Sequence, residues 1–192
     1  MRELSLHILD ILQNSVEAGA SQVALTIGED LPGDRLSVVV TDNGRGMDAG
    51  QVARATDPFF TTRKTRHVGL GLPLLSAAAQ HCGGGLTIQS TPGAGTMVTA
   101  AFQHSHIDRA PLGNIRDTLL AFVLADSVDR PCELSYRHRV DDQTFAFSTA
   151  EIRAELDGLP LSHPQVRNWL REFIAEGEAE LYKPEAETSD RG

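Results

Sequence analysis

The stretch Leu36-Ser-Val-Val-Val-Thr41, followed directly by Asp42-Asn-Gly-Arg-Gly46, decides the fold of this chain. A short apolar run bounded by turn-forming residues is typical of a buried β-strand. The strand ends on the carboxylate of Asp42, which can accept a hydrogen bond from the exocyclic amine of a base. Glycine has no Cβ, so the two glycines that follow let a flat base approach the backbone closely. The sequence therefore predicts a ligand-binding edge where this strand ends.

Helices and strands flank this strand on both sides. Apolar residues at near-helical spacing predict a helix over residues 4–18: Leu4, Ile8, Ile11, Leu12 and Val16. The other expected elements are, in chain order, a strand at 23–27, the strand at 36–41, a helix near 48–55, an irregular segment from 56 to 68, a helix at 70–80 and a hairpin of 86–90 with 96–102. This order is typical of a two-layer α/β (α+β) sandwich, with a mixed sheet and helices on one face.

The remainder of the chain predicts a smaller α+β region. It contains a helix at 113–126, a hairpin of 132–139 with 143–148, and two helices that begin at the capping pairs Ser148/Glu151 and Ser162/Gln165. We expect two domains, residues 1–103 and residues 104–192, the second of unknown role and ending in an acidic tail. The alternative is that the hairpin and helices extend the first domain into one continuous unit. Trp169 lies on the amphipathic last helix, where core packing is favoured and partner docking is the alternative.

The charge balance bears on the class of partner. The net charge is −9, of which residues 1–103 supply −2 (7 basic and 9 acidic) and residues 104–192 supply −7 (10 basic and 17 acidic). Nucleic-acid binding needs a basic patch, so we expect no nucleic-acid partner. No apolar run reaches the roughly 18 residues of a membrane helix, and the N-terminus does not resemble a signal peptide. We expect a cytoplasmic protein with no membrane partner. Cys82 and Cys132 indicate neither a disulfide framework nor a zinc site.

Several further residues suit a phosphorylated ligand. Asp10 and Asn14 are four residues apart and therefore lie on one face of the first helix. The amide oxygen of Asn14 suits Mg²⁺, which prefers oxygen ligands, and Asp10 could orient or deprotonate an attacking group one turn away. Gly69 and Gly71 open a helix whose free backbone amides attract phosphate. Lys64, one of only two lysines in the chain, lies in the loop before that helix.

Taken in order, these motifs resemble those of the GHKL superfamily of ATP-binding domains, which includes sensor histidine kinases, MutL-type mismatch-repair ATPases, type II topoisomerases and heat-shock chaperones. The boxes that match are the N-box at 9–20, the G1 box at 42–47, the F and G2 boxes of histidine kinases at 57–62 and 68–72, and the final glycine box at 93–96. The resemblance covers residues 1–103. It implies the Bergerat sandwich fold with a site for ATP and Mg²⁺.

The resemblance also implies a role for each matching residue. Asn14 would bind Mg²⁺, Asp42 would bind the adenine amine, and Thr96 would support that contact directly or through water. The G1 box would line the nucleotide through Gly44, Gly46 and Met47. The lid and the G2 box would hold the phosphates through Lys64, Gly69, Leu70 and Gly71.

Three departures from the family pattern bear on activity. Hydrolysing members place a general-base Glu where this chain has Asp10, whose carboxylate is one methylene shorter, so hydrolysis is left open. The G2 box lacks its usual first glycine, because His67-Val68 precedes Gly69. The ATP-binding region begins at residue 1, without the dimerisation domain and phospho-accepting His of a sensor kinase upstream. We therefore expect a stand-alone ATP-binding domain.

Two functions of different classes follow from these expectations. The first is an enzyme, a kinase or ATPase that hydrolyses the γ-phosphate of ATP or transfers it to a protein, as anti-sigma-factor kinases of this superfamily do. The second is a non-catalytic binding module, in which Mg-ATP orders the 56–68 lid and so exposes or hides a partner surface. Both predict a regulatory protein with a protein partner, and a homodimer is left open. A DNA-repair role, suggested by the N-box, is disfavoured by the acidic balance.

Overall fold

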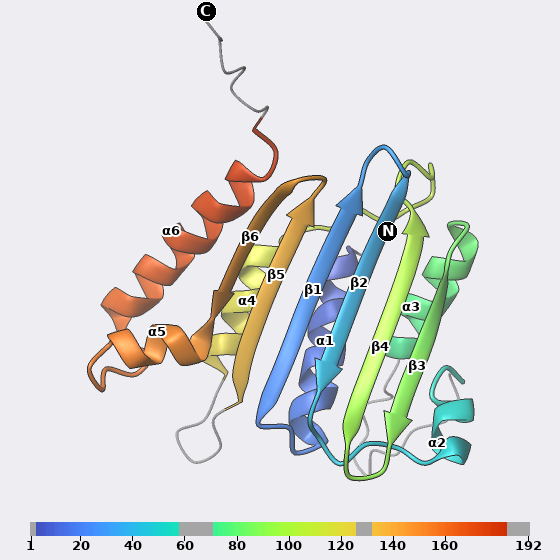
Figure 1. The fold of residues 1–192 in the computed structure, drawn as a ribbon, viewed down its shortest axis with the longest axis horizontal. Helices are drawn as coiled ribbons and strands as arrows, with labels where there is room; N and C mark the ends of the chain where they lie inside the picture. The colour runs from blue at the N-terminus through green and yellow to red at the C-terminus, as the bar shows by residue number, and fades with distance from the viewer. Residues whose placement is uncertain (1–2, 58–70, 126–131, 184–192) are drawn as a thin grey trace, which may run out of the picture.

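The structure, a computed structural model, describes residues 3–57, 71–125 and 132–183. Their elements are, in chain order, α1 (Leu4–Glu17), β1 (Gln22–Asp30), β2 (Arg35–Asp42), α2 (Ala49–Arg54), α3 (Gly71–His81), β3 (Gly85–Thr91), β4 (Gly95–Gln103), α4 (Ile115–Leu124), β5 (Glu133–Val140), β6 (Gln143–Ser148), α5 (Thr149–Glu155) and α6 (Pro164–Glu180). The six strands form one mixed sheet, and α1, α3 and α4 lie behind it in Figure 1. The predicted sandwich is confirmed.

Alternating burial places the core between the sheet and these helices. The strand order is β3-β4-β2-β1-β5-β6, so β1 and β2 occupy the centre. Every second residue of β1 is buried, with Val23, Leu25 and Ile27 at most 2% exposed. The intervening side chains face the uncovered side, as the two-residue period of a strand requires. Because β1 and β2 are antiparallel with Val23 opposite Asp42, the end of β2 lies beside the start of β1.

The buried face of α1 differs from the predicted stripe at one position. Leu4, Ile8, Ile11 and Leu12 are buried as expected, but Val16 is 46% exposed and Ser15 is buried in its place. Four of the apolar positions therefore face the core, and the predicted helix is present although Val16 is not part of its buried face. Ser15 faces inward because its hydroxyl donates a hydrogen bond to Asp42 inside the fold.

The second half of the chain joins the same sheet. β5 pairs with β1 in parallel, from Gln22 opposite Glu133 to Glu29 opposite Val140. β6 pairs with β5 in an antiparallel hairpin, and α4 packs against both α1 and α6. Strands from both sides of residue 103 are therefore hydrogen-bonded in one sheet. Within the described residues, no helix has the length and apolar character needed to cross a membrane.

The first residues of α5 and α6 differ in one respect from the sequence-based expectation. Ser148 is the N-cap residue of α5, as expected, although its side chain makes no capping hydrogen bond there. The capping box expected at Ser162 is wrong, because α6 begins at Pro164 with His163 as its N-cap residue. Proline suits the first helical position, where its missing N–H has no partner to lose. It also pushes the preceding residue into an extended conformation, and this fixes the helix start one residue later.

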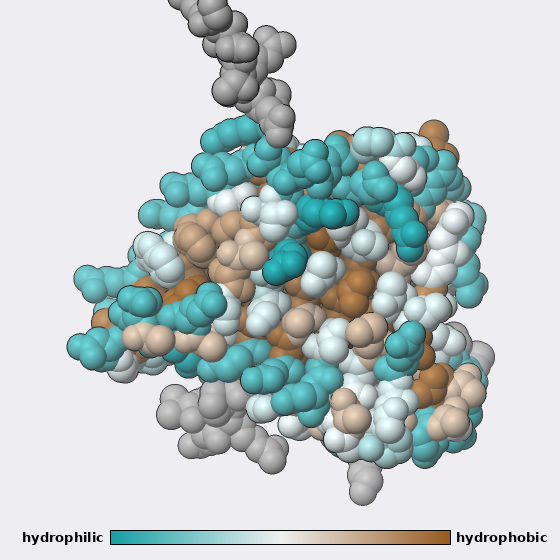
Figure 2. Space-filling model, in the orientation of Figure 1, coloured by the Kyte–Doolittle hydropathy of each residue, from teal (hydrophilic) through white to brown (hydrophobic). Residues whose placement is uncertain are grey.

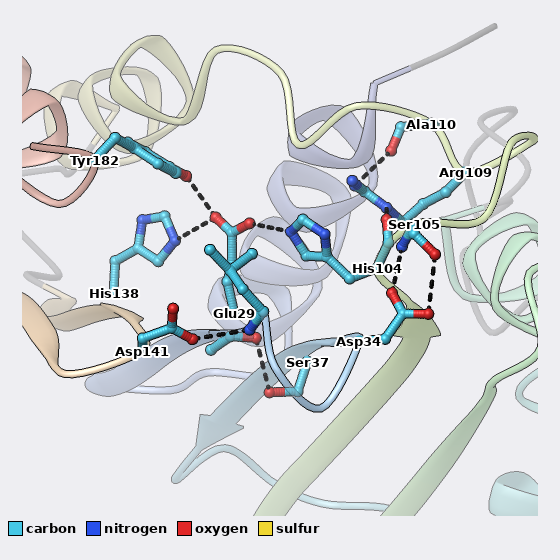
Figure 3. Close-up of polar contacts among 12 residues, drawn as sticks. Glu29, Asp34, Ser37, His104, Ser105, Arg109, Ala110, His138, Asp141 and Tyr182 are labelled. Carbon is cyan, nitrogen blue, oxygen red and sulfur yellow. Dashed lines mark hydrogen bonds and ion pairs between the residues drawn. The ribbon is translucent and has the colours of Figure 1, made fainter. Parts of the chain in front are cut away.

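A polar cluster around the buried side chains of Glu29 and His138 closes the far end of the β1–β5 pair (Figure 3). The Glu29 carboxylate accepts hydrogen bonds from His104 Nε2 at 2.6 Å, His138 Nε2 at 3.1 Å and the Tyr182 hydroxyl. His138 is fully buried, and its Nδ1 faces Glu178 of α6 at 2.9 Å. Both ring nitrogens of His138 thus face carboxylates, and only an imidazolium donates from both. The cluster ties β1, β5 and α6 together.

The titration of this cluster follows from its contacts. Burial by itself would raise the pKa of Glu29, but hydrogen bonds from His138, Tyr182 and His104 outweigh it and lower the pKa to about 2. Burial would lower the pKa of His138, but its hydrogen bonds to Glu178 and Glu29 outweigh this effect and raise the pKa to about 9. Between pH values of about 2 and 9, the stable state of the cluster therefore has Glu29 ionised and His138 protonated.

These shifts predict how the free energy of unfolding depends on pH. The stabilisation from His138 is complete below its ordinary pKa of 6.5 and is lost as the pH rises to about 9. At 1.36 kcal/mol for each pKa unit, this loss is about 3 kcal/mol. The Glu29 contribution is complete above its ordinary pKa of 4.5 and is lost as the pH falls towards about 2. Urea unfolding at pH 6.5 and pH 9 measures the first loss.

A His138→Gln variant should lose most of this difference between pH 6.5 and pH 9. The matched control is His81→Gln, because His81 has a side chain that is 72% exposed. That control should keep the wild-type pH dependence. Equal pH dependence in the His138 variant and the wild type would contradict the assignment of His138 as the titrating group.

Candidate nucleotide-binding site

The carboxylate of Asp42 is fixed at the end of β2 by two hydrogen bonds. Its Oδ2 accepts from the hydroxyl of Ser15 on α1 at 2.9 Å, and its Oδ1 accepts from the backbone N–H of Gly44 at 2.8 Å. Each oxygen keeps a second lone pair for a ligand. The side chain is half-buried. The structure thus places an oriented acceptor where the sequence predicts a contact to a base.

Ser15 is a site residue that the sequence reasoning missed. It is 2% exposed, although serine is usually found at the surface. A signal was present, because Ser15 falls four residues after Ile11 and so continues the apolar stripe of α1. A polar residue in a buried stripe needs a hydrogen-bond partner inside the fold. Asp42 is that partner, which explains why Ser15 rather than Val16 faces inward.

Thr96 lies directly across the sheet from Asp42. The two residues are opposite one another in the β2–β4 register. The hydroxyl of Ser90 accepts from the Met47 N–H at 2.8 Å, donates to the Gly95 carbonyl at 2.9 Å and lies 2.9 Å from Thr96 Oγ1. Since Ser90 uses its one proton on Gly95, the Thr96 hydroxyl donates to Ser90. Its own lone pairs then stay available beside Asp42, and the supporting role of Thr96 in binding a base stays a prediction.

The glycines of the G1 stretch have structural roles of their own. A Cβ on Gly44 would lie 2.9 Å from the Cβ of Ala18, and one on Gly46 would lie 2.0 Å from the Thr91 carbonyl oxygen. Gly46 also has a φ of +66°, which favours glycine. The loop after β2 therefore packs closely on the end of α1 and on the β3–β4 turn. A direct contact of Gly44, Gly46 or Met47 with a nucleotide stays a prediction.

Asp10 and Asn14 project from the same helix as Ser15. Asp10 lies against the first residue of α3, because a Cβ on Gly71 would be 2.7 Å from the Cβ of Asp10. The helix N-terminus at Gly71, which attracts anions through its free N–H groups, therefore lies beside Asp10. Between Asp10 and Ser15 the helix rises about 7.5 Å. α1 thus contacts Asp42 at one position and the start of α3 roughly a turn and a half away.

Part of the predicted phosphate site falls outside the described residues. These positions are Lys64, Gly69 and Leu70. Among the residues that are described, Asp42 of β2 lies opposite Thr96 of β4 and is hydrogen-bonded to Ser15 of α1, and Asp10 of α1 lies against Gly71 of α3. Asn14 lies on α1 between Asp10 and Ser15. These residues come from four elements along residues 10–96, so the site is assembled by the fold and not by one local motif. No group of three His, Cys, Asp or Glu residues able to hold a metal occurs within the described part of the chain.

Comparison with known proteins agrees with this geometry. Residues 2–106 match the family described as "Histidine kinase-, DNA gyrase B-, and HSP90-like ATPase". The chain is 37% identical over 110 residues to the sensor protein kinase FleS of Pseudomonas aeruginosa, covering 57% of this chain and 27% of that protein. It is 33% identical over 103 residues to the tetrathionate sensor histidine kinase TtrS of Salmonella typhimurium, covering 52% and 17%. The chain thus spans between a sixth and a third of the length of these relatives.

A solved structure extends the likeness in fold. The crystal structure of the N-terminal domain of a DNA repair protein superposes with a TM-score of 0.51 at 12% identity, covering 76% of this chain and 52% of that one. This coverage exceeds what residues 1–103 could supply, so it includes part of the second half of the chain. At this identity the likeness concerns the fold alone.

The chain belongs to the histidine kinase-, DNA gyrase B- and HSP90-like ATPase family. The family match covers more than half of the chain, and the family implies ATP binding. The residues present fit that ligand, because Asp42 offers an oriented acceptor for an amine and the start of α3 offers free amides for phosphate. The predicted membership is confirmed.

The hydrogen bond from Ser15 to Asp42 predicts an effect on ATP affinity. A Ser15→Ala variant leaves the Asp42 carboxylate less constrained, and one hydrogen bond to a charged group contributes about 1.5 kcal/mol. We expect ATP to bind about tenfold more weakly by isothermal titration calorimetry. Asp42→Asn, which presents a donor to the adenine amine, should abolish ATP binding. It sets the largest loss of affinity with which Ser15→Ala is compared.

Ser37→Ala serves as the matched control for this experiment. It removes a hydroxyl that donates to the Gly28 carbonyl on the uncovered face of the sheet. This variant should bind ATP with wild-type affinity. A Ser15→Ala protein that is folded by urea titration and binds ATP as tightly as the wild type would remove Ser15 from the site.

Proposed function

We propose that this protein binds ATP with Mg²⁺ at the site formed by α1, the ends of β2 and β4 and the start of α3, and that the bound nucleotide regulates a protein partner. The observation that carries the proposal is the Asp42 carboxylate, which is held by Ser15 and Gly44 opposite Thr96. A fixed acceptor beside a hydroxyl suits the exocyclic amine of adenine. Fixing it in advance also lowers the entropy lost on binding.

The orientation of the nucleotide follows from α1. With the adenine at Asp42, the phosphates extend towards Asp10 and the N-terminus of α3, where backbone amides favour anions. Asn14 lies between these two ends and offers an amide oxygen to Mg²⁺. When it is bound, this ion neutralises charge on the phosphate oxygens. Lys64, Gly69 and Leu70 would complete the phosphate contacts.

Asp10 is the residue proposed to act on the γ-phosphate. It is exposed beside Gly71, so its carboxylate can reach a water molecule or a partner's hydroxyl or imidazole next to the phosphate end. There it would accept the proton of the attacking group. Its side chain is one methylene shorter than the Glu of hydrolysing relatives, which favours slow hydrolysis or phosphoryl transfer to a protein over rapid turnover.

The second candidate is a non-catalytic, nucleotide-gated binding module. The close packing of Gly71 on Asp10 favours the binding module, because a movement at the start of α3 on binding phosphate would displace α1 directly. In this case ATP shifts the protein towards one conformation by binding it more tightly than the other. Partner binding then depends on ATP and not on turnover.

The proposed ligand role of Asn14 predicts a metal-dependent effect. In Asn14→Ala, ATP affinity measured by calorimetry should fall about tenfold in the presence of Mg²⁺, because the ion loses a protein oxygen ligand. In EDTA the loss should be small. Gln13→Ala is the control, because Gln13 is an exposed neighbour on the same helix. Equal losses with and without Mg²⁺ would contradict the role of Asn14 as a metal ligand.

An Asp10→Asn variant separates the two candidate functions. If Asp10 accepts the proton, phosphate release over hours, or transfer of radiolabelled phosphate, should fall at least about a hundredfold while ATP affinity is kept. Asp142→Asn, at an exposed turn of the second half, should leave both unchanged. Wild-type protein that binds ATP tightly without any phosphate release or transfer would instead favour the gated module.

A further inference from the structure

An apolar pocket lies between α5 and α6, on the part of the chain outside the family match. Its volume is about 450 Å³, which is within the range of protein ligand pockets. Its lining consists of Ile152, Ala154, Leu156 and Trp169 together with Glu151 and Glu155. Figure 2 shows apolar surface between these two helices, surrounded by hydrophilic residues. Nothing in the proposed nucleotide site uses this pocket.

Trp169 is held in place although it is 46% exposed. Its ring stacks on Phe173, with ring centroids 5.1 Å apart and planes 12° from parallel. Phe173 in turn makes edge contacts with Phe145 and Phe147 of β6. The exposed indole is therefore fixed by a row of aromatic rings that reaches the core. A large, pre-oriented aromatic surface of this kind is typical of the residues that dominate protein–protein binding.

The border of the pocket is acidic on both helices. Glu151 and Glu155 are one turn apart on α5. On α6, Glu172 and Glu176 follow Trp169 by three and seven residues, so they lie alongside it on the exposed face. None of the ion pairs within the described residues neutralises any of these four carboxylates. The apolar pocket thus has in its lining two glutamates that are unpaired within the described part of the chain, and two more lie beside Trp169 on α6.

We propose that this pocket docks a basic amphipathic segment of a partner protein, with an apolar side chain inserted against Trp169 and lysines or arginines facing the four glutamates. Charge complementarity selects this occupant. A second copy of this chain would oppose glutamates to glutamates at a net charge of −9 for each copy. An anionic membrane surface or a nucleic acid would be repelled by the same carboxylates. An apolar anchor with flanking basic residues satisfies both features of the pocket.

The chain contains one tryptophan, so its fluorescence reports on this pocket alone. The probe is an 18-residue helical peptide with leucines at positions i, i+3, i+4 and i+7 and lysines elsewhere. Titrating it into the protein should shift the emission of Trp169 to shorter wavelength and saturate with one peptide per chain. Two comparison peptides are matched to it: one replaces every lysine by glutamate, and the other replaces every leucine by serine. Neither should bind.

A charge-neutral variant tests the acidic border while it keeps the reporter. In Glu151→Gln with Glu155→Gln, the Leu/Lys peptide should bind about fivefold or more weakly at low salt. The matched control, Asp142→Asn with Glu180→Gln, removes the same charge away from the pocket. It should bind like the wild type. Trp169→Ala, followed by anisotropy of a labelled peptide, should lose binding, with folding checked by urea titration.

Other outcomes would overturn the proposal. Equal binding of the Leu/Glu peptide would show that charge does not select the occupant. Equal weakening in both charge variants would show that only net charge matters. Concentration-dependent self-association that Trp169→Ala abolishes would assign the pocket to a second copy. A fluorescence shift with vesicles of anionic phospholipid would assign it to a membrane surface. The absence of any shift with the Leu/Lys peptide would leave the pocket without the proposed partner.

Discussion

The arrangement of the whole chain depends on the parallel pairing of β1 with β5. This pairing joins the second half of the chain to the family domain, because β1 is already paired with β2 on its other edge. At its far end, the buried Glu29 is satisfied by His138, His104 and Tyr182. A buried carboxylate is tolerated only when it is paired and hydrogen-bonded. The cluster therefore fixes how β5, α6 and the turn after α6 are positioned relative to β1.

Helix α1 links this core to the proposed nucleotide site. One face packs on the central strands, and residues on and beside that face bind or approach Asp42 and the start of α3. The site is thus built on rigid elements, which keeps its polar groups in place before a ligand arrives. The acidic pocket at α5 and α6 belongs to the other half, and α4, which packs on both α1 and α6, lies between them. The two surfaces are therefore connected through packed helices.

Much of the site could be predicted from the sequence because its motifs are local. A strand ending on Asp42, a helix carrying Asp10 and Asn14, and a turn at residues 91–95 are each visible within a few residues. Ser15 and Ser90 were missed because their roles depend on partners elsewhere in the chain. Similarly, Ser162 has the spacing of a capping box, but the backbone restriction imposed by Pro164 decides where α6 begins.

The sequence by itself determined the alternation of buried and exposed residues along the strands, the order of the elements and the membership of an ATPase family. Periodicity of side chains and the backbone freedom of glycine are properties of short segments, so they can be read without the fold. Only the tertiary structure decided that Ser15 meets Asp42 across 27 residues and that His138 meets Glu29 across 109. Such contacts depend on strand register and helix packing, and these are determined by the core as a whole.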